Sequence, residues 1–305
     1  MAWPPILVRY GEIGIKTRSV RAQFERRLVD RIEEQLVARG VEAEVQRGFG
    51  RLYVRAADVD GALDALAHTF GIVSASPAIE CAPTPEGVAE VALRVAREAM
   101  PAGASFALRV KRSGAHPFTS LDVAKHAAGR ILDELADRKP TVDLDAPDFP
   151  IAAEVREGEG FVFTRTVRGP GGLPLGSQGR VGLLVEGPRA AHAAWLIGKR
   201  GASILFLSAD PAQAEAWLAP LRRWMPRLRV HAIRAATRAD ALGEAASFLA
   251  QNRCQALVVA DGAAEALARF EEDRAAGVPV FRPLVGFEGP RFAQLCRDAE
   301  LPEVA

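Results

Sequence analysis

Cysteine is scarce in this sequence and is poorly placed for chemistry. The chain has three cysteines, Cys81, Cys254 and Cys296, which form neither a CxxC pair nor the spacing of a metal site. An odd number of widely separated cysteines is typical of reduced thiols in a cytoplasmic protein. We therefore expect no bound metal ion, and we assign these thiols no catalytic role.

Long apolar runs and a strong charge of one sign are also lacking. No apolar run approaches the ~20 residues of a membrane-spanning helix, and the first residues lack the basic and apolar regions of a signal peptide. We therefore expect a cytoplasmic protein without membrane contact. The formal net charge of +1 does not by itself call for a nucleic-acid partner. The first 56 residues differ, because they contain eleven Lys and Arg against seven Asp and Glu.

The length of 305 residues exceeds that of one ordinary core, and the pattern divides the chain into three parts. In residues 1–76, a strand at 6–10 precedes a helix over 20–39. The apolar residues of this helix recur every fourth position, at Phe24, Leu28, Ile32 and Leu36. Two further strands and a helix are predicted at 41–45, 51–55 and 59–69. These elements predict a small ferredoxin-like α+β domain.

The second part, residues 77–168, is predicted to be another mixed domain. Its helices are expected at 86–100 and 120–136, and its strands at 106–110, 142–144, 151–155 and 161–167. Residues 169–178 follow, with so many Gly and Pro residues that no regular element can form there. We therefore interpret residues 169–178 as a linker.

The third part, residues 179–305, alternates short apolar runs with helical patterns. Strands are predicted at 181–185, 203–207, 230–233, 256–260 and 278–281. This alternation predicts a Rossmann-like parallel sheet with helices on both faces. The first strand leads through Glu186, Gly187 and Pro188 into a helix, and such a strand–turn–helix is where related sheets bind nucleotides.

Five motifs, in order, resemble those of the tRNA 4-thiouridine synthetase family. They are residues 9–16 (RYGEIGIK), 109–113 with 118–120, 142–144 with 151–157, 169–176 (GPGGLPLG) and 282–287 (RPLVGF). The resemblance covers nearly the whole chain. It implies a ferredoxin-like domain, a THUMP domain that binds RNA, and a nucleotide-binding domain of the PP-loop type. It also implies tRNA as the partner and 4-thiouridine formation as the related tRNA modification.

The resemblance fails at the nucleotide-binding loop. Family members carry Ser-Gly-Gly-x-Asp-Ser after the first strand of this domain. The corresponding residues here are Val185, Glu186, Gly187, Pro188, Arg189 and Ala190. Glu186 would place a negative charge beside phosphates, and Pro188 removes a backbone donor. Only Arg189 acts the other way, since a guanidinium pairs with phosphate. We therefore predict a degenerate nucleotide loop without a cofactor.

Cations and aromatic residues of the first two parts form the candidate RNA-binding set. Between residues 106 and 125, four cations stand against a single acid, Asp122. Phosphates require cations, and the bases of single-stranded RNA stack on aromatic rings. Such residues also occur at ordinary solvated strand ends, and the family resemblance favours RNA. The set is Arg9, Lys16, Arg109, Lys111, Arg112, His116, Phe118, Thr119 and Lys125.

These observations favour a tRNA-binding protein related to the tRNA 4-thiouridine synthetases that lacks ATP-dependent adenylation. It would present tRNA to a separate catalytic tRNA-modifying subunit or form a homodimer. One alternative is a divergent ATP-dependent tRNA uridine 4-sulfurtransferase, with ATP and Mg²⁺ in a rebuilt site. A second alternative is a structural scaffold or partner subunit without RNA binding. Nucleotide binding separates the first two hypotheses, and RNA binding separates both from the third.

Overall fold

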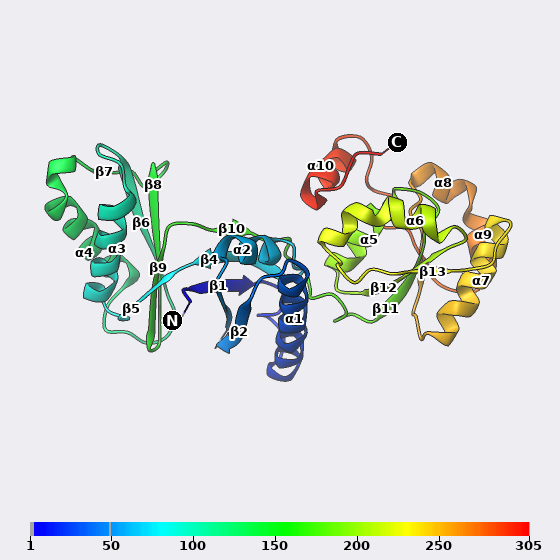
Figure 1. Ribbon diagram of the computed structural model, residues 1–305, viewed down its shortest axis with the longest axis horizontal. Helices are drawn as coiled ribbons and strands as arrows, with labels where there is room; N and C mark the ends of the chain where they lie inside the picture. Colours follow the sequence, from blue (N-terminus) through cyan, green and yellow to red (C-terminus); the bar gives the residue numbers. More distant parts are fainter. Residues whose placement is uncertain (1–2, 49, 305) are drawn as a thin grey trace.

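The computed structural model describes residues 3–48 and 50–304, which form three five-stranded sheets arranged along one long axis (Figure 1). The N-terminal sheet lies in the middle, with the second domain at one end and the C-terminal sheet at the other. The first domain therefore contacts both of the others. Within the described residues, no helix has the length and apolar character needed to span a lipid bilayer.

The N-terminal domain has the ferredoxin-like fold that the sequence predicts. Its elements are β1 (Pro5–Tyr10), α1 (Arg18–Ala38), β2 (Ala43–Gly48), β3 (Arg51–Ala56), α2 (Val59–Ala67) and β4 (Ile72–Pro77). A later strand, β10 (Val167–Arg168), joins this sheet at one edge. The strand order is β10-β4-β1-β3-β2, and all pairs are antiparallel. The predicted stripe of α1 is buried against this sheet, because its apolar side chains share one helix face.

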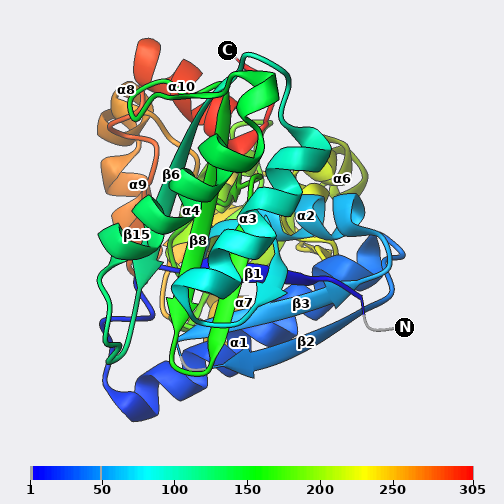
Figure 2. The same ribbon diagram turned by 90° about the vertical axis from the view of Figure 1, so that its left-hand side faces the viewer.

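The second domain packs two helices on one face of a mixed sheet. Its elements are β5 (Ile79–Cys81), α3 (Pro85–Ala99), β6 (Ser105–Arg112), α4 (Ser120–Glu134), η1 (Ala136–Arg138), β7 (Thr141–Val142), β8 (Phe149–Arg156) and β9 (Glu159–Phe163). Figure 2 shows α3 and α4 on the outer face of this sheet. The opposite face meets the N-terminal domain, where Tyr53 packs on Phe161.

One strand prediction in this region is wrong in its extent. We expected a single strand over 161–167, but β9 ends at Phe163 and a separate strand, β10 (Val167–Arg168), follows. β10 pairs with β4 at the edge of the N-terminal sheet. The chain therefore leaves the second domain and returns to the first before it enters the linker. The sequence pattern of residues 161–167 cannot reveal this change of sheet, because its first and last residues both have the composition of a strand.

The C-terminal domain is the parallel sheet that the alternating pattern predicts, in the order β13-β12-β11-β14-β15. Its elements are β11 (Arg180–Leu184), α5 (Ala190–Lys199), β12 (Ser203–Ser208), α6 (Pro211–Leu218), η2 (Ala219–Arg223), β13 (Val230–Ala232), α7 (Arg238–Gln251), β14 (Leu257–Val258), α8 (Ala263–Ala268), α9 (Phe270–Ala275), β15 (Val280–Phe281) and α10 (Pro290–Ala299).

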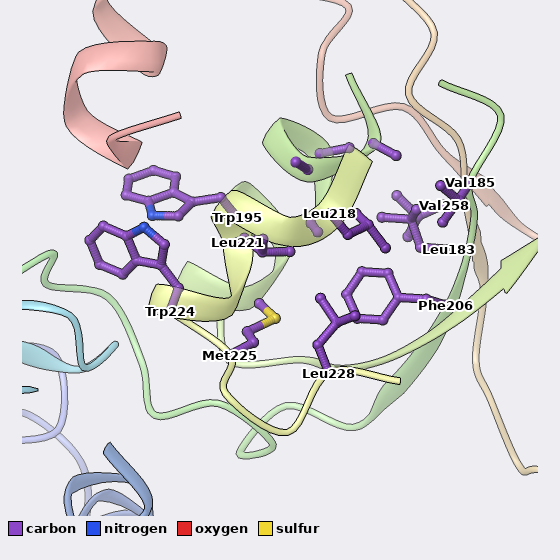
Figure 3. Packing of buried hydrophobic residues seen from close by; sticks show 14 of the residues in the cluster. Leu183, Val185, Trp195, Phe206, Leu218, Leu221, Trp224, Met225, Leu228 and Val258 are labelled. Atoms are coloured by element: carbon purple, nitrogen blue, oxygen red, sulfur yellow. The ribbon is translucent and has the colours of Figure 1, made fainter. Parts of the chain in front are cut away.

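Successive strand residues point to opposite faces of this sheet, and both faces are buried. Leu183 and Phe206 pack toward α5 and α6 (Figure 3), whereas Leu184 and Leu207 pack toward α7. The helices on both faces confirm the predicted architecture. Strands with two apolar faces also explain why the sequence shows continuous apolar runs there.

The linker, residues 169–178, is fastened to two cores. Leu173 is buried in the N-terminal core, and Leu175 packs against the C-terminal core. Phe70, which follows α2, reaches into the C-terminal core and stacks on Trp224 with 5.3 Å between the ring centroids. Apolar side chains therefore fix the N-terminal and C-terminal domains against each other.

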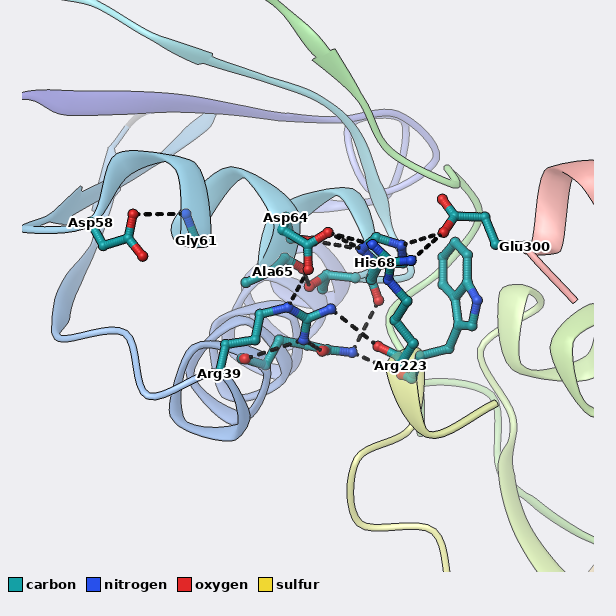
Figure 4. Close-up of polar contacts among 11 residues, drawn as sticks. Arg39, Asp58, Gly61, Asp64, Ala65, His68, Arg223 and Glu300 are labelled. Atoms are coloured by element: carbon teal, nitrogen blue, oxygen red, sulfur yellow. Dashed lines mark hydrogen bonds and ion pairs between the residues drawn. The ribbon is translucent and has the colours of Figure 1, made fainter. Parts of the chain in front are cut away.

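Polar side chains extend this junction (Figure 4). Arg39 donates to Asp64 at 2.7 Å, and Arg223 of the C-terminal domain bridges Asp64 and Glu300 at 2.7 Å each. The buried amide of Gln35 donates to backbone carbonyls of both domains at 3.0 and 2.9 Å. Because a buried amide must be paired, the two hydrogen bonds of Gln35 favour one relative orientation of the two domains, whereas the ion pairs of Arg223 lie at the surface.

Candidate functional site

The C-terminal sheet reverses its strand order between β11 and β14, and related sheets bind ligands at such a point. The loops after these two strands border a hollow of ≈ 180 Å³ lined by Glu186, Pro188, Arg189 and Asp261, among others. A second hollow of ≈ 290 Å³ lies on the other side of Glu186, above β12 and β13. The structure thus places the candidate loop where a nucleotide site would be expected.

Ion pairs occupy this crevice. Arg238 at the start of α7 pairs with Glu186 at 3.0 Å, with Asp261 at 3.4 Å and with Glu272 at 3.3 Å. Arg269 donates to the other oxygen of Asp261 at 2.7 Å. The Asp261 side chain is only 4% exposed, so this carboxylate is held inside the network. Guanidinium groups that could meet phosphates are therefore already neutralised by carboxylates of the same chain.

The N-terminus of α5 offers few free donors. The backbone N–H groups of Ala190, Ala191 and His192 donate to the carbonyl oxygens three residues earlier, at 3.1, 3.3 and 3.1 Å. A phosphate at a helix N-terminus relies on such N–H groups. A side chain at Gly187 would meet no protein atom within 4 Å, so packing within the protein does not require glycine there.

The other loop residues point to structural roles. Val185 and Ala190, which stand where the family carries hydroxyl groups, are buried in the C-terminal core. Arg189 lies 3.7 Å from Glu265, and its guanidinium lies over the ring of Phe292 at 5.3 Å. The one cation expected to favour phosphate is therefore engaged by a carboxylate and an aromatic ring.

Cys296 contacts His192 beneath this loop, with 3.4 Å between Sγ and Nε2. Both side chains are buried, and burial raises the pKa of Cys296 and lowers the pKa of His192. The pair is therefore a neutral thiol beside a neutral imidazole, which is a poor nucleophile. The described residues contain no group of three or more His, Cys, Asp or Glu side chains suited to a metal ion.

The cations of the second domain form the other candidate site. Lys111 and Arg112 end β6, and both are exposed without a side-chain hydrogen bond or ion pair among the described residues. Lys125 is exposed on α4, and Arg109 donates to the carbonyl of Leu144 at 2.8 Å. The structure thus places Arg109, Lys111 and Arg112 on β6, and Lys125 on α4, which packs against that strand.

Three predicted residues shape the turn between β6 and α4. Thr119 is the N-cap of α4 and forms a capping box with Asp122. Its backbone N–H lowers the pKa of Asp122 by donating to that carboxylate. His116 donates from Nε2 to the carbonyl of Ser113 at 3.0 Å, and its ring lies 5.3 Å from that of Phe118. Phe118 is half-buried against the core of the second domain. These contacts hold the segment that follows Lys111 and Arg112.

Arg9 occupies a different environment from the one its sequence motif indicates. Its Nε donates to Glu154 of β8 at 2.6 Å, and only 11% of the side chain is exposed. Arg51 pairs with the same carboxylate at 3.1 Å. Arg156 of the second domain also lies 3.9 Å from Glu154, so cations from two domains converge on this acid. Lys16 is half-exposed in the turn before α1.

Sequence reasoning did not single out Arg51 or Glu154 as members of one cluster. The weak signal for Arg51 was the excess of cations in the first 56 residues. Nothing in the sequence pairs it with an acid on a strand of the next domain. The interface between the first two domains is therefore a structural finding.

Comparisons with known protein families assign the first two domains. The ThiI ferredoxin-like domain family matches residues 5–76, and the THUMP domain family matches residues 84–165. A probable tRNA sulfurtransferase of Halobacterium salinarum is 40% identical over 202 residues, which are 66% of this chain and 51% of that protein. A tRNA sulfurtransferase of Desulfurococcus amylolyticus is 36% identical over 200 residues, which are 65% of this chain and 40% of that protein. The chain spans about half the length of the curated relatives it matches.

Solved structures resemble the whole chain. The crystal structure of PH1313 from Pyrococcus horikoshii Ot3 has a TM-score of 0.82 and 26% identity, and the match covers 99% of this chain and 100% of that one. A 4-thiouridine synthetase in complex with RNA and bound ATP has a TM-score of 0.76 and 22% identity, with 98% and 84% coverage. At that identity the second likeness shows the fold alone.

Proposed function

We propose that this chain, whose first two domains belong to the ThiI ferredoxin-like and THUMP domain families, binds tRNA but does not adenylate it. The observation that carries this proposal is a contrast between two sets of cations. Lys111 and Arg112 of the THUMP domain face solvent without partners among the described residues, whereas Arg238 of the nucleotide crevice pairs with three carboxylates. The first set is available for phosphates, and the second is not.

The proposal assigns the domains as residues 1–76, 77–168 and 179–305, joined by the linker 169–178. The last two residues of the second range form β10, which pairs in the sheet of the first domain. RNA binding belongs to the first two, with Lys111, Arg112 and Lys125 as the principal phosphate contacts. Arg9 supports this surface from the domain interface, because it shares Glu154 with Arg51. The chemistry on the tRNA then requires a second, catalytic subunit, to which this protein presents its RNA.

The test is a gel-shift titration of full-length protein with tRNA at several salt concentrations. Each phosphate contact on a single strand contributes a log–log salt slope of about −0.7. Lys111→Ala combined with Arg112→Ala should therefore weaken binding to different tRNAs similarly and flatten the slope by about 1.4. The fold should be unaffected, because exposed charges contribute little to stability.

A charge-matched control is available in the same domain. Arg94→Ala combined with Lys139→Gln also removes two exposed cations. Lys139 precedes β7, which pairs with the first residues of β6, whereas Lys111 and Arg112 end that strand. A strand of this length separates the two ends by about 20 Å. An equal loss of tRNA affinity in the two double variants would exclude the β6 end from the RNA site. If neither double variant loses affinity, the scaffold hypothesis is favoured.

Calorimetric titration with Mg-ATP tests the second half of the proposal. No saturable binding is expected at about 1 mM nucleotide. A dissociation constant of about 1 mM corresponds to a binding free energy of about −4.1 kcal/mol. A micromolar dissociation constant would refute the loss of nucleotide binding and would favour the ATP-dependent tRNA uridine 4-sulfurtransferase instead.

A further inference from the structure

A cleft lies between the N-terminal and C-terminal domains. It has a volume of ≈ 190 Å³ and lies between α1 and the C-terminal sheet. Arg27 and Arg31 line it from α1, and Arg227 lines it from the segment between η2 and β13. The apolar side of the cleft consists of Leu175, Ile204, Phe206, Met225 and Leu228. We name this site the α1 cleft.

The α1 cleft carries an excess of positive charge. Glu34 is its one acidic side chain and is only 8% exposed. Glu34 pairs with Arg31, and it also lies 3.7 Å from Arg227. Arg27 makes no ion pair or side-chain hydrogen bond with any described residue, and Nε of Arg31 has no acceptor among them. Two guanidiniums therefore share one carboxylate and that of Arg27 has none, which leaves donors for an anion.

The α1 cleft is separate from the nucleotide crevice. Ser203 and Ile204, which line it, begin β12, whereas the crevice lies beyond the carboxyl ends of the strands. The two ends of a six-residue strand are about 17–20 Å apart. A ligand in the α1 cleft would therefore leave the Arg238 network untouched.

The chemistry of the lining defines the ligand. Guanidiniums recognise phosphate through paired hydrogen bonds and stack on planar rings. The apolar side offers a surface for a flat ring, and the volume is below the ~300–1,000 Å³ of a complete small-molecule site. The cleft therefore fits one nucleobase, with the attached phosphate at the arginine rim. Inorganic phosphate alone would leave the apolar side in contact with water.

We propose that the α1 cleft binds a nucleoside phosphate, either as a free mononucleotide or as the terminal nucleotide of an RNA strand. The second source rests on the proposed function, because it requires RNA to reach the protein. Both sources share the same recognition: phosphate on Arg27 and Arg227, and the base against the apolar side.

The test is calorimetric titration of the full-length protein with uridine monophosphate, uridine and inorganic phosphate. Uridine monophosphate should bind saturably, and each of the other two should bind at least about 10-fold more weakly, which is about 1.4 kcal/mol. Arg27→Ala combined with Arg227→Ala should weaken uridine monophosphate binding by about 10-fold or more. Absence of saturable binding to the wild-type protein, or equal affinity for phosphate alone, overturns the proposal.

Neighbouring arginines provide the matched control. Arg26 precedes Arg27, and Arg229 lies two residues after Arg227. Both are exposed, and neither lines the cleft. Arg26→Ala combined with Arg229→Ala should leave the affinity for uridine monophosphate unchanged while removing the same charge. Equal losses in the two double variants would indicate a general effect of positive charge and would overturn the specific site.

Two further arms separate the sources and the two proposals. A short oligonucleotide with a 5′-phosphate that binds more tightly than uridine monophosphate identifies an RNA terminus, and the opposite order identifies a free nucleotide. Lys111→Ala with Arg112→Ala should retain uridine monophosphate binding. If tRNA binding depends on Lys111 and Arg112 while uridine monophosphate does not bind at all, the α1 cleft proposal fails and the proposed function stands.

Discussion

Replacing Glu154 by Gln should loosen the interface between the first two domains. The Glu154 side chain is 4% exposed and accepts hydrogen bonds from Arg9 and Arg51, both of which come from the N-terminal domain. Gln keeps the shape of the side chain but removes its charge, so two partly buried guanidiniums lose their counter-ion. Breaking a buried ion pair in this way costs about 3–5 kcal/mol.

Hydrogen exchange is the appropriate assay, because a chain with several domains need not unfold in one step. Amides of β1 and β8, the strands that carry Arg9 and Glu154, should exchange about 100-fold faster or more in the variant. A cost of about 3 kcal/mol corresponds to this factor, because each 1.4 kcal/mol changes the exchange rate about tenfold. Glu134→Gln is the matched control, since that carboxylate also contacts two arginines but lies on the surface. Similar exchange in both variants would refute the role of Glu154 at the interface.

The same comparison has a defined pH dependence. Burial alone would raise the pKa of Glu154, but Arg9 and Arg51 outweigh it and hold the pKa below its ordinary value. A carboxyl group with a depressed pKa in the folded state contributes its full stability above the unfolded pKa of about 4.3, and that contribution is lost as the pH falls through the folded pKa. The difference between the wild-type protein and Glu154→Gln should therefore narrow below about pH 4.

Three further predictions concern the junction around the linker and the thiol of Cys81. Phe70→Ala removes the ring that stacks on Trp224, and it should cost about 3–5 kcal/mol and speed proteolysis within residues 169–178; unchanged proteolysis would contradict this. Gly172→Ala should lower the thermal midpoint of unfolding more than Gly171→Ala. Both glycines have positive φ, but only at Gly172 would the new Cβ lie 2.1 Å from a backbone oxygen of α5. Equal midpoints in the two variants would contradict this prediction. Burial raises the pKa of Cys81 to about 11, so its thiol should react slowly with a disulfide reagent near pH 8, and rapid labelling of the folded protein would disprove this.

The elements that the sequence predicted well are those with a local period or a complete apolar run. The four residues of the α1 stripe identify a buried face whatever packs against it, and all four are buried. The strands of the C-terminal sheet are apolar because both faces are covered. The strands β4, β5 and β10 were not predicted as such. β5 and β10 have only three and two residues, and their strand character comes from pairing with distant segments.

The sequence was enough to propose residues for the candidate site but not to arrange them. Glu186 and Pro188 already indicated a loop poorly suited to phosphate, because charge and a missing N–H are local properties. The sequence could not show that Arg238 neutralises Glu186, since the two residues meet only when α7 packs beside β11. Arg9 was treated as a surface cation, although its partner Glu154 is 145 residues away along the chain. Long-range ion pairs decide which cations are free to meet a ligand.

The linker has a consequence for changes in chain length. Leu173 and Leu175 enter different cores, with Pro174 between them against Gly71. A single inserted or deleted residue would therefore withdraw one leucine from its core or shift one domain against the other. We expect the linker to accept substitutions at exposed positions but no insertion or deletion between Leu173 and Leu175, so its length is more strictly specified than its sequence.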